Sequence, residues 1–174
     1  ERRVSVKHTD LEELLGAAKF TADTIDETPL KFEQYAKAAL YSDPFYGLFD
    51  PCMKEGMNAY YADLAERFFA YAAEGGEFAE LYDMAAKNCA VLAHKAESGL
   101  RARRAYQSGD REALAAVAED LTVSAGRVRA FYEAYREHWY RIFKPYGFEI
   151  QQYRLVGLAE RLLDCADRIR AYLA

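Results

Sequence analysis

The feature that most constrains the fold is a long apolar stripe between residues 114 and 142. Its members alternate at spacings of three and four residues, which places them on one face of a single helix: Leu114, Val117, Leu121, Ser124, Val128, Phe131, Tyr135, His138 and Ile142. At about 1.5 Å per residue, such a helix is about 45 Å long. A stripe of this length predicts a fold built from long helices.

Three further stripes have the same helical period. They are Met53, Met57, Tyr60, Leu64, Phe68 and Tyr71; Phe78, Leu81, Ala85, Cys89, Leu92 and Ala96; and Leu155, Leu158, Leu162, Cys165, Ile169 and Tyr172. The middle one predicts a helix that continues toward Tyr106. Breaks are expected at Gly75-Gly76, at Ser108-Gly109-Asp110 with Asp110 as the next N-cap, and at Pro145 through Gly147.

Four long helices joined by short breaks predict an all-α, antiparallel up-down bundle over residues 51–174. Residues 1–50 are rich in aromatic side chains and predict a short appendage of helical pieces and ordered loop. A capping box from Thr9 to Glu12 should open a short helix within this appendage. We expect residues 1–174 to form one domain, because no break is long enough to serve as a linker.

Composition excludes several classes of partner. The formal net charge is −5, and no basic stripe exists that would match the phosphates of a nucleic acid. No run of about 18 apolar residues exists, so no membrane span is expected.

The odd number of cysteines, Cys52, Cys89 and Cys165, predicts buried free thiols and a cytoplasmic location. Because the chain opens at Glu1 without a Met, we expect it to be a piece of a longer protein.

The sequence has no motif that predicts metal or cofactor chemistry. A di-iron bundle needs Glu three residues before His, but Ser5, Val91 and Tyr135 precede the three histidines at that distance. No G-x-S-x-G elbow and no Gly-rich phosphate loop occurs. His138 has two readings, a general base or a core histidine bonded to a neighbouring hydroxyl, and we favour the second. His94 is expected at the surface.

Charged clusters and tyrosines have structural explanations as well. Glu119 and Asp120 are adjacent on a helix, where their side chains diverge by about 100°. Arg101, Arg103 and Arg104 match the C-terminal end of a helix dipole. The 14 tyrosines favour packing with hydrogen-bonded tips, with an interface as the second interpretation.

Two segments also resemble a known family. One is residues 40–50, which read LYSDPFYGLFD, and the other runs from His138-Trp139 through Lys144-Pro145-Tyr146-Gly147-Phe148-Glu149 to Arg161-Leu162. Over about residues 30–174 the chain resembles the C-terminal helical domain of one branch of the family 20 glycoside hydrolases, the β-N-acetylhexosaminidases. It departs from that pattern at Ser42, Phe143 and Val156. Where the family has glycine, Val156 predicts a looser contact of its helix with a neighbour.

The resemblance implies that the chain is a fragment of a larger enzyme, in which this domain follows a catalytic barrel. Such enzymes remove terminal β-linked N-acetylglucosamine or N-acetylgalactosamine by a retaining, substrate-assisted route, with an adjacent Asp and Glu at the end of a barrel strand. A barrel takes about 250 residues and does not fit in this chain. Neither Asp26-Glu27 nor Glu119-Asp120 follows a strand, so no catalytic residue is assigned here.

We therefore expect an accessory domain that braces the barrel of the same polypeptide and contributes to an interface or to a wall of the sugar site, with a homo-oligomer as a further option. The candidate residues are Tyr41, Asp43, Phe49, Asp50, Trp139, Lys144, Glu149 and Arg154. The charged residues among them, Asp43, Asp50, Lys144, Glu149 and Arg154, are equally candidates for buried ion pairs. Lys144 and Glu149 are further candidates for satisfying the backbone at the Pro-Tyr-Gly corner, and Arg154 and Arg161 for pairing with a neighbouring helix.

Two alternatives stay open. One is a free-standing helical module for protein–protein interaction, and the other is a bundle that holds a small ligand between its helices. An accessory domain predicts a filled core with an exposed apolar patch of several hundred Å², whereas a ligand-binding bundle predicts a sizeable internal cavity.

Overall fold

The computed structural model describes residues 35–50 and 53–174. Within them the chain forms helices and no strand, which confirms the all-α fold class. The helices are α2 (Tyr35–Tyr41), α3 (Met57–Ala73), α4 (Ala79–Lys95), α5 (Ser98–Ser108), α6 (Arg111–Ile142) and α7 (Phe148–Leu173). The expected capping box at Thr9 and the thiol of Cys52 lie outside the described residues.

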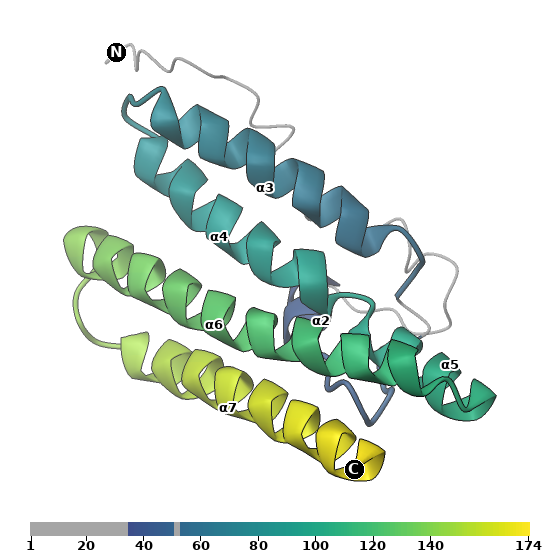
Figure 1. Ribbon diagram of the computed structural model, residues 1–174. Helices are drawn as coiled ribbons and strands as arrows, with labels where there is room; N and C mark the ends of the chain where they lie inside the picture. The colour runs from purple at the N-terminus through teal and green to yellow at the C-terminus, as the bar shows by residue number, and fades with distance from the viewer. Residues whose placement is uncertain (1–34, 51–52) are drawn as a thin grey trace.

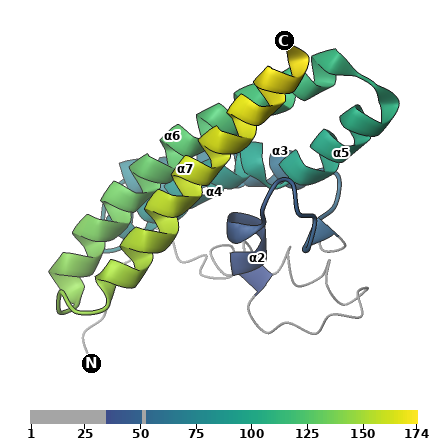
Figure 2. The ribbon, with the colours of Figure 1, turned by 90° about the horizontal axis from the view of Figure 1, so that it is seen from below.

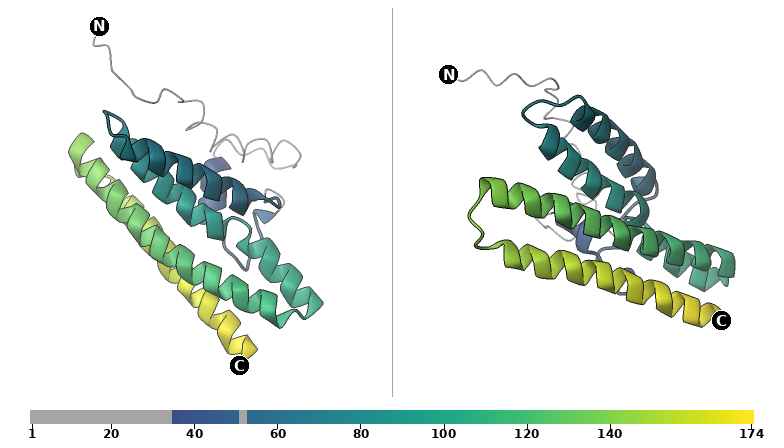
Figure 3. Two further views of the ribbon diagram at one scale, coloured as in Figure 1. Left: turned by 45° about the horizontal axis from the view of Figure 1, so that its top comes forward. Right: turned by 60° about the vertical axis from the view of Figure 1, so that its left-hand side comes forward.

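The long helices follow one another in space as α3, α4, α6 and α7, and each runs antiparallel to the next (Figure 1). The α3–α4 hairpin is inclined to the α6–α7 hairpin, as Figure 3 shows from two sides. Helix α5 packs on the N-terminal part of α6. Seen from below, α2 and the turn that follows it lie on one side of the long helices (Figure 2). This arrangement is the predicted antiparallel bundle, built from two hairpins.

The expected start and stop signals lie where the sequence places them. Asp110 caps α6, and its carboxylate accepts a hydrogen bond of 2.9 Å from the amide of Ala113. The paired glycines after α3 both have positive φ, as does Gly147 just before α7. Such backbone angles suit glycine because it lacks a Cβ. These local signals set the lengths of the helices.

The core follows the predicted stripes in α6 and α7. In α6 the stripe from Leu114 to Phe131 is buried, and α7 buries Leu155, Leu158 and Leu162 against it. In the first half of α4, Tyr82 and Ala86 are buried in place of the predicted Leu81 and Ala85, and Met53 is buried but precedes α3.

Two predicted stripes are longer than the part of the helix that is buried, because Ile142 is 58% exposed and Tyr172 is 57% exposed. Ile142 lies at the last residue of α6, and Tyr172 lies near the end of α7, where the ring of Tyr106 from α5 lies against it.

The helix expected to run from residue 78 toward Tyr106 is divided into α4 and α5. A reciprocal contact with α3 accounts for the break. The amide of Asn58 donates to the Glu97 carboxylate at 2.8 Å, and the amide of Glu97 donates to the Asn58 side chain at 3.1 Å. A continuous helix would instead bond the Glu97 amide to the carbonyl four residues earlier. A tertiary contact has therefore replaced a local one.

None of the described helices is long and apolar enough to cross a membrane. The thiols of Cys89 and Cys165 are free and buried, as predicted. Burial raises the pKa of the Cys89 thiol to about 12. These thiols are therefore neutral core side chains.

Candidate functional site

Seven of the eight predicted site residues fall into two places. Tyr41, Asp43, Phe49 and Asp50 lie in or next to the turn formed by residues 42–50, hereafter the 42–50 turn. Trp139, Lys144 and Glu149 lie at the connection between α6 and α7. Arg154 is exposed on the first half of α7 and interacts electrostatically with Tyr41.

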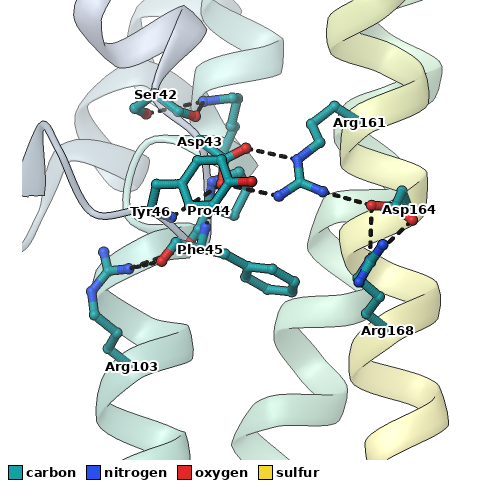
Figure 4. A network of polar contacts seen from close by, with 10 residues as sticks. Ser42, Asp43, Pro44, Phe45, Tyr46, Arg103, Arg161, Asp164 and Arg168 are labelled. Carbon is teal, nitrogen blue, oxygen red and sulfur yellow. Dashed lines mark hydrogen bonds and ion pairs between the residues drawn. The ribbon is translucent and has the colours of Figure 1, made fainter.

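Asp43 joins the 42–50 turn to α7. Its carboxylate accepts hydrogen bonds from the amides of Phe45 and Tyr46, at 2.8 and 3.1 Å, which closes the turn on itself. The same carboxylate receives two bonds from the Arg161 guanidinium, at 2.7 and 3.3 Å (Figure 4). Arg161 also binds Asp164 of its own helix at 2.6 Å. Two segments that lie 118 residues apart in the sequence are thus held together by a bidentate ion pair.

The electrostatics of this pair favour both charged forms. Burial alone would raise the pKa of the Asp43 carboxyl, but the hydrogen bonds from Arg161 and from the two turn amides outweigh it and hold that pKa below its ordinary value. The hydrogen bond to Asp43 in turn raises the pKa of Arg161. Asp43 is therefore a fixed anion, and no proton-transfer role follows from it.

A second arginine holds the other end of the turn. Arg103 of α5 pairs with the Asp50 carboxylate and donates to the carbonyl of Pro44 at 3.2 Å. Gly99 makes this approach possible, since a Cβ there would lie 2.7 Å from the Arg103 guanidinium and 3.2 Å from the Pro44 carbonyl. Asp43 and Asp50 therefore both form the partly buried ion pairs that were one of their two predicted roles.

A buried lysine anchors the start of the turn. Lys95 is 1% exposed, and its ammonium donates to the carbonyls of Ala39 and Ser42 at 3.0 and 2.7 Å and to the Ser42 hydroxyl at 3.1 Å. Desolvation by burial lowers the pKa of Lys95 to about 7, against the opposing effects of Asp43 and Cys165. Lys95 thus bonds backbone carbonyls at the end of α2, where a helix has no further amides of its own to supply; the Ser42 hydroxyl also donates to the carbonyl of Ala39, at 3.3 Å.

The clamped turn presents apolar side chains to solvent. Tyr46 is 80% exposed, and Leu48 and Phe45 are also exposed. The rings of Phe45 and Tyr46 lie 5.6 and 5.5 Å from the Arg161 guanidinium carbon, within the range of a cation–π contact. Phe49 instead packs partly buried against the core. The turn is therefore held by Lys95, Arg103 and Arg161, while the side chains at its tip remain exposed.

At the α6–α7 connection, the predicted residues organise the backbone. The indole N–H of Trp139 donates to the carbonyl of Lys144 at 3.0 Å, and the Glu149 carboxylate accepts from the amide of Gly147 at 2.8 Å. The Trp139 ring contacts Phe143 and Phe148. Glu149 thus has the backbone role expected for it, and Lys144 contributes its carbonyl while its side chain is exposed.

Large apolar side chains are exposed on several sides of this connection. We call them the corner patch, and they are Tyr140, Ile142, Phe143, Tyr146, Ile150, Tyr153 and Val156. Tyr146 is 88% exposed and Tyr153 is 76% exposed. Because Val156 is also exposed, it faces solvent and not a neighbouring helix, so the looser helix contact predicted for it does not arise. An accumulation of this kind is typical of a surface that another protein or domain covers.

The other sequence candidates do not converge on a reactive group. Asp120 lies between His94 of α4 and Arg101 of α5, at 2.8 and 2.5 Å, while Glu119 pairs with Arg170. The adjacent acids therefore diverge, as predicted. Within residues 35–50 and 53–174, no three His, Cys, Asp or Glu side chains are grouped so that they could hold a metal ion.

Two interpretations of individual residues change. The ionic partner of His138 is Glu80, at 3.7 Å, and the buried Nδ1 of the ring has no hydrogen-bond partner among the described residues, so no hydroxyl bonds it as predicted. The basic run of α5 is explained by three separate acids and not by the helix dipole. Arg101 pairs with Asp120, while Arg103 and Arg104 pair with Asp50 and Glu55.

Sequence reasoning missed the cations that hold the 42–50 turn. Lys95 falls on the apolar stripe of its helix, three residues after Leu92, and a lysine in that position was a usable signal. Arg103 belongs to the basic run that was assigned to the helix dipole, so its contact with the turn was not predicted. Arg161 was expected to pair with a neighbouring helix, and its partners are the 42–50 turn and its own helix.

The comparisons with known proteins agree with the resemblance of the two segments. A comparison with curated proteins finds no match. A family model described as the Glycoside Hydrolase 20C C-terminal domain matches residues 14–174, nearly the whole chain. The segments that carry the resemblance, 40–50 and 138–162, are those that the Asp43–Arg161 pair joins. The chain therefore belongs to the family of glycoside hydrolase 20C C-terminal domains.

Proposed function

We propose that this chain is a non-catalytic accessory domain of a β-N-acetylhexosaminidase, an enzyme that removes terminal β-linked N-acetylglucosamine or N-acetylgalactosamine. Its role is to brace the catalytic barrel of the same polypeptide. Family membership supports the position after the barrel. Free buried thiols at Cys89 and Cys165 support a reducing, cytoplasmic setting.

The corner patch is the observation that carries this proposal. Its seven side chains lie within 17 residues of sequence, from Tyr140 to Val156, beside a core that is filled. Phe148 is fully buried at the start of α7, and its ring contacts those of Trp139 and Tyr140, so the exposed side chains border packed rings. A rigid apolar surface of this kind suits a stable contact between domains better than a transient one.

The position next to Val156 fits the same role. Gly157 has open space where a Cβ would lie, so no group among the described residues requires a glycine there. A small residue on an exposed helix face allows the backbone of a partner to approach closely. We infer that this part of α7 continues the barrel-facing surface.

The test compares the isolated chain with the full-length enzyme that contains it. The double variant Tyr146→Ser/Tyr153→Ser changes two exposed rings and should leave the thermal midpoint of the isolated chain unchanged. In the full-length enzyme, the same change should lower the midpoint of the helical domain and speed proteolytic cleavage between the domains. Val123→Ser is the matched control, because Val123 is 41% exposed on α6 away from the corner.

The proposal fails if the full-length double variant behaves like the Val123→Ser control. A second measurement tests the absence of catalysis. The isolated chain should release no nitrophenol from 4-nitrophenyl N-acetyl-β-glucosaminide, and a rate within about two orders of magnitude of the full-length enzyme would contradict the assignment.

A further inference from the structure

A pocket opens at the end of the α6–α7 hairpin opposite the corner patch. It lies among α5, the start of α6, the end of α7 and the 42–50 turn, and its volume is about 280 Å³. Leu114 in the pocket and Ile142 in the corner patch are 28 residues apart on α6, or about 42 Å at 1.5 Å per residue. The pocket is therefore separate from the surface assigned to the barrel.

The floor of the pocket is apolar, and its walls carry aromatic rings together with the side chains of Arg103 and Gln107. Ala102, Leu114 and Ile169 form the floor, and each is almost fully buried. The rings of Tyr106 and Tyr172 lie 5.5 Å apart at one side. Such a lining favours a flat apolar group over a strongly hydrated one.

The remaining wall belongs to the 42–50 turn, which the contacts with Asp43 and Arg103 hold in place. Phe45 lines the pocket, and its backbone is fixed because its amide bonds to Asp43 and its neighbour Pro44 accepts from Arg103. In Figure 4 the Phe45 ring points toward the part of α7 that carries Arg168. A wall held in this way loses little conformational entropy when a ligand binds.

Arg168 supplies a cation at the rim. Its hydrogen bonds run from Nε to the Asp164 carboxylate, at 3.1 and 3.0 Å, which leaves its two terminal nitrogens for solvent or for a ligand. Asp164 is shared with Arg161, so the charge of Arg168 is only partly compensated. Arginine donors in this position match a carboxylate, which accepts two parallel hydrogen bonds.

We propose that this pocket binds a small molecule that has one flat aromatic body and one carboxylate. The body lies on Leu114 and Ile169 between the rings of Phe45 and Tyr172, and the carboxylate bonds to Arg168. The limited volume restricts the body to one or two fused rings. This inference does not depend on the proposed bracing of a barrel.

The probe for this site is 2-naphthoate, and 2-naphthamide serves as its uncharged counterpart. Calorimetry on the full 174-residue chain measures both affinities, and amide NMR shifts locate the site. We expect 2-naphthoate to bind at least fivefold more tightly than 2-naphthamide, with shifts at Ala102, Leu114 and Ile169. Arg168→Gln should weaken 2-naphthoate about tenfold and leave 2-naphthamide unchanged, because it removes the charged donor alone.

Two further variants complete the test. Tyr172→Ala removes a wall and should weaken both probes. Arg129→Gln is the matched control, since Arg129 is an exposed arginine of α6 that pairs with Glu160, and it should weaken neither. Equal affinity for the two probes, no binding at millimolar concentration, or shifts centred on the corner patch would each overturn the proposal.

Discussion

The burial of Lys95 predicts an unusual dependence of stability on pH. The pKa of Lys95 is 10.5 when the residue is free in water and about 7 in the folded chain, because desolvation disfavours the ammonium. Above about pH 7 the folded chain therefore releases this proton, while the unfolded chain keeps it until about pH 10.5. Unfolding then takes up a proton, so a rise in pH disfavours it. The contribution of Lys95 to the free energy of unfolding must rise with pH across this window.

The magnitude follows from the same two values. One pKa unit corresponds to about 1.4 kcal/mol, so the interval from 10.5 to about 7 corresponds to about 5 kcal/mol between the two ends of the window. Between pH 7.5 and 9.5 the gain is about 2 to 2.5 kcal/mol. The contribution is constant below about pH 7, where both states carry the charge.

The variant Lys95→Met isolates this effect, because methionine has a similar reach and does not titrate. Urea unfolding followed by circular dichroism gives the free energy of unfolding for both proteins between pH 6.5 and 9.5. The difference, wild type minus variant, should increase by about 2 to 2.5 kcal/mol from pH 7.5 to 9.5. The contributions of other groups that titrate in this range are the same in both proteins, so they cancel in the difference between the two free energies of unfolding.

Lys87→Met is the control, since Lys87 lies on the same helix and pairs with Asp83 at the surface. Its difference from the wild type should not change over the same range. Parallel curves for the wild type and Lys95→Met would refute the reasoning, because they would mean that Lys95 keeps its proton in the folded chain.

Three substitutions test the rest of the structure by the same urea assay. Asp43→Asn should cost about 1–3 kcal/mol at pH 7, because it removes the charge that Arg161 binds; since the folded-state pKa of Asp43 is lowered, this cost should shrink as the pH falls below the ordinary carboxyl value of 3.8. Asp110→Ala should cost about 1 kcal/mol through loss of the α6 N-cap, whereas Asp110→Asn keeps the acceptor and should cost less. Leu121→Ala should cost about 2–5 kcal/mol, since Leu121 is fully buried at the centre of the core. An effect below about 0.5 kcal/mol for Leu121→Ala would contradict a close-packed core.

The two proposed sites lie at opposite ends of the α6–α7 hairpin. The corner patch lies at the connection between α6 and α7, and the aromatic pocket lies at the far end of the same helices. The 42–50 turn is held between α4, α5 and α7 by Lys95, Arg103 and Arg161. A substitution of one of these three residues should therefore alter the pocket, through the position of Phe45, and leave the corner patch unchanged.

The sequence by itself determined the long helices α6 and α7 and the breaks next to them. Helix periodicity and capping are local, so the stripe from Leu114 to Phe131, the cap at Asp110 and the break at Gly147 could be read directly. The family resemblance could also be found in the sequence alone, because it rests on two contiguous segments.

Tertiary structure alone decided which charges meet and where a regular helix must stop. Nothing local links Asp43 to Arg161 across 118 residues, and periodicity does not show that Asn58 interrupts the helix at Glu97. Lys95 is charged in the sequence and yet buried, because only the folded chain brings the carbonyls of Ala39 and Ser42 to its ammonium. Local patterns specify a backbone, while the pairing of distant polar groups depends on the packing of whole helices.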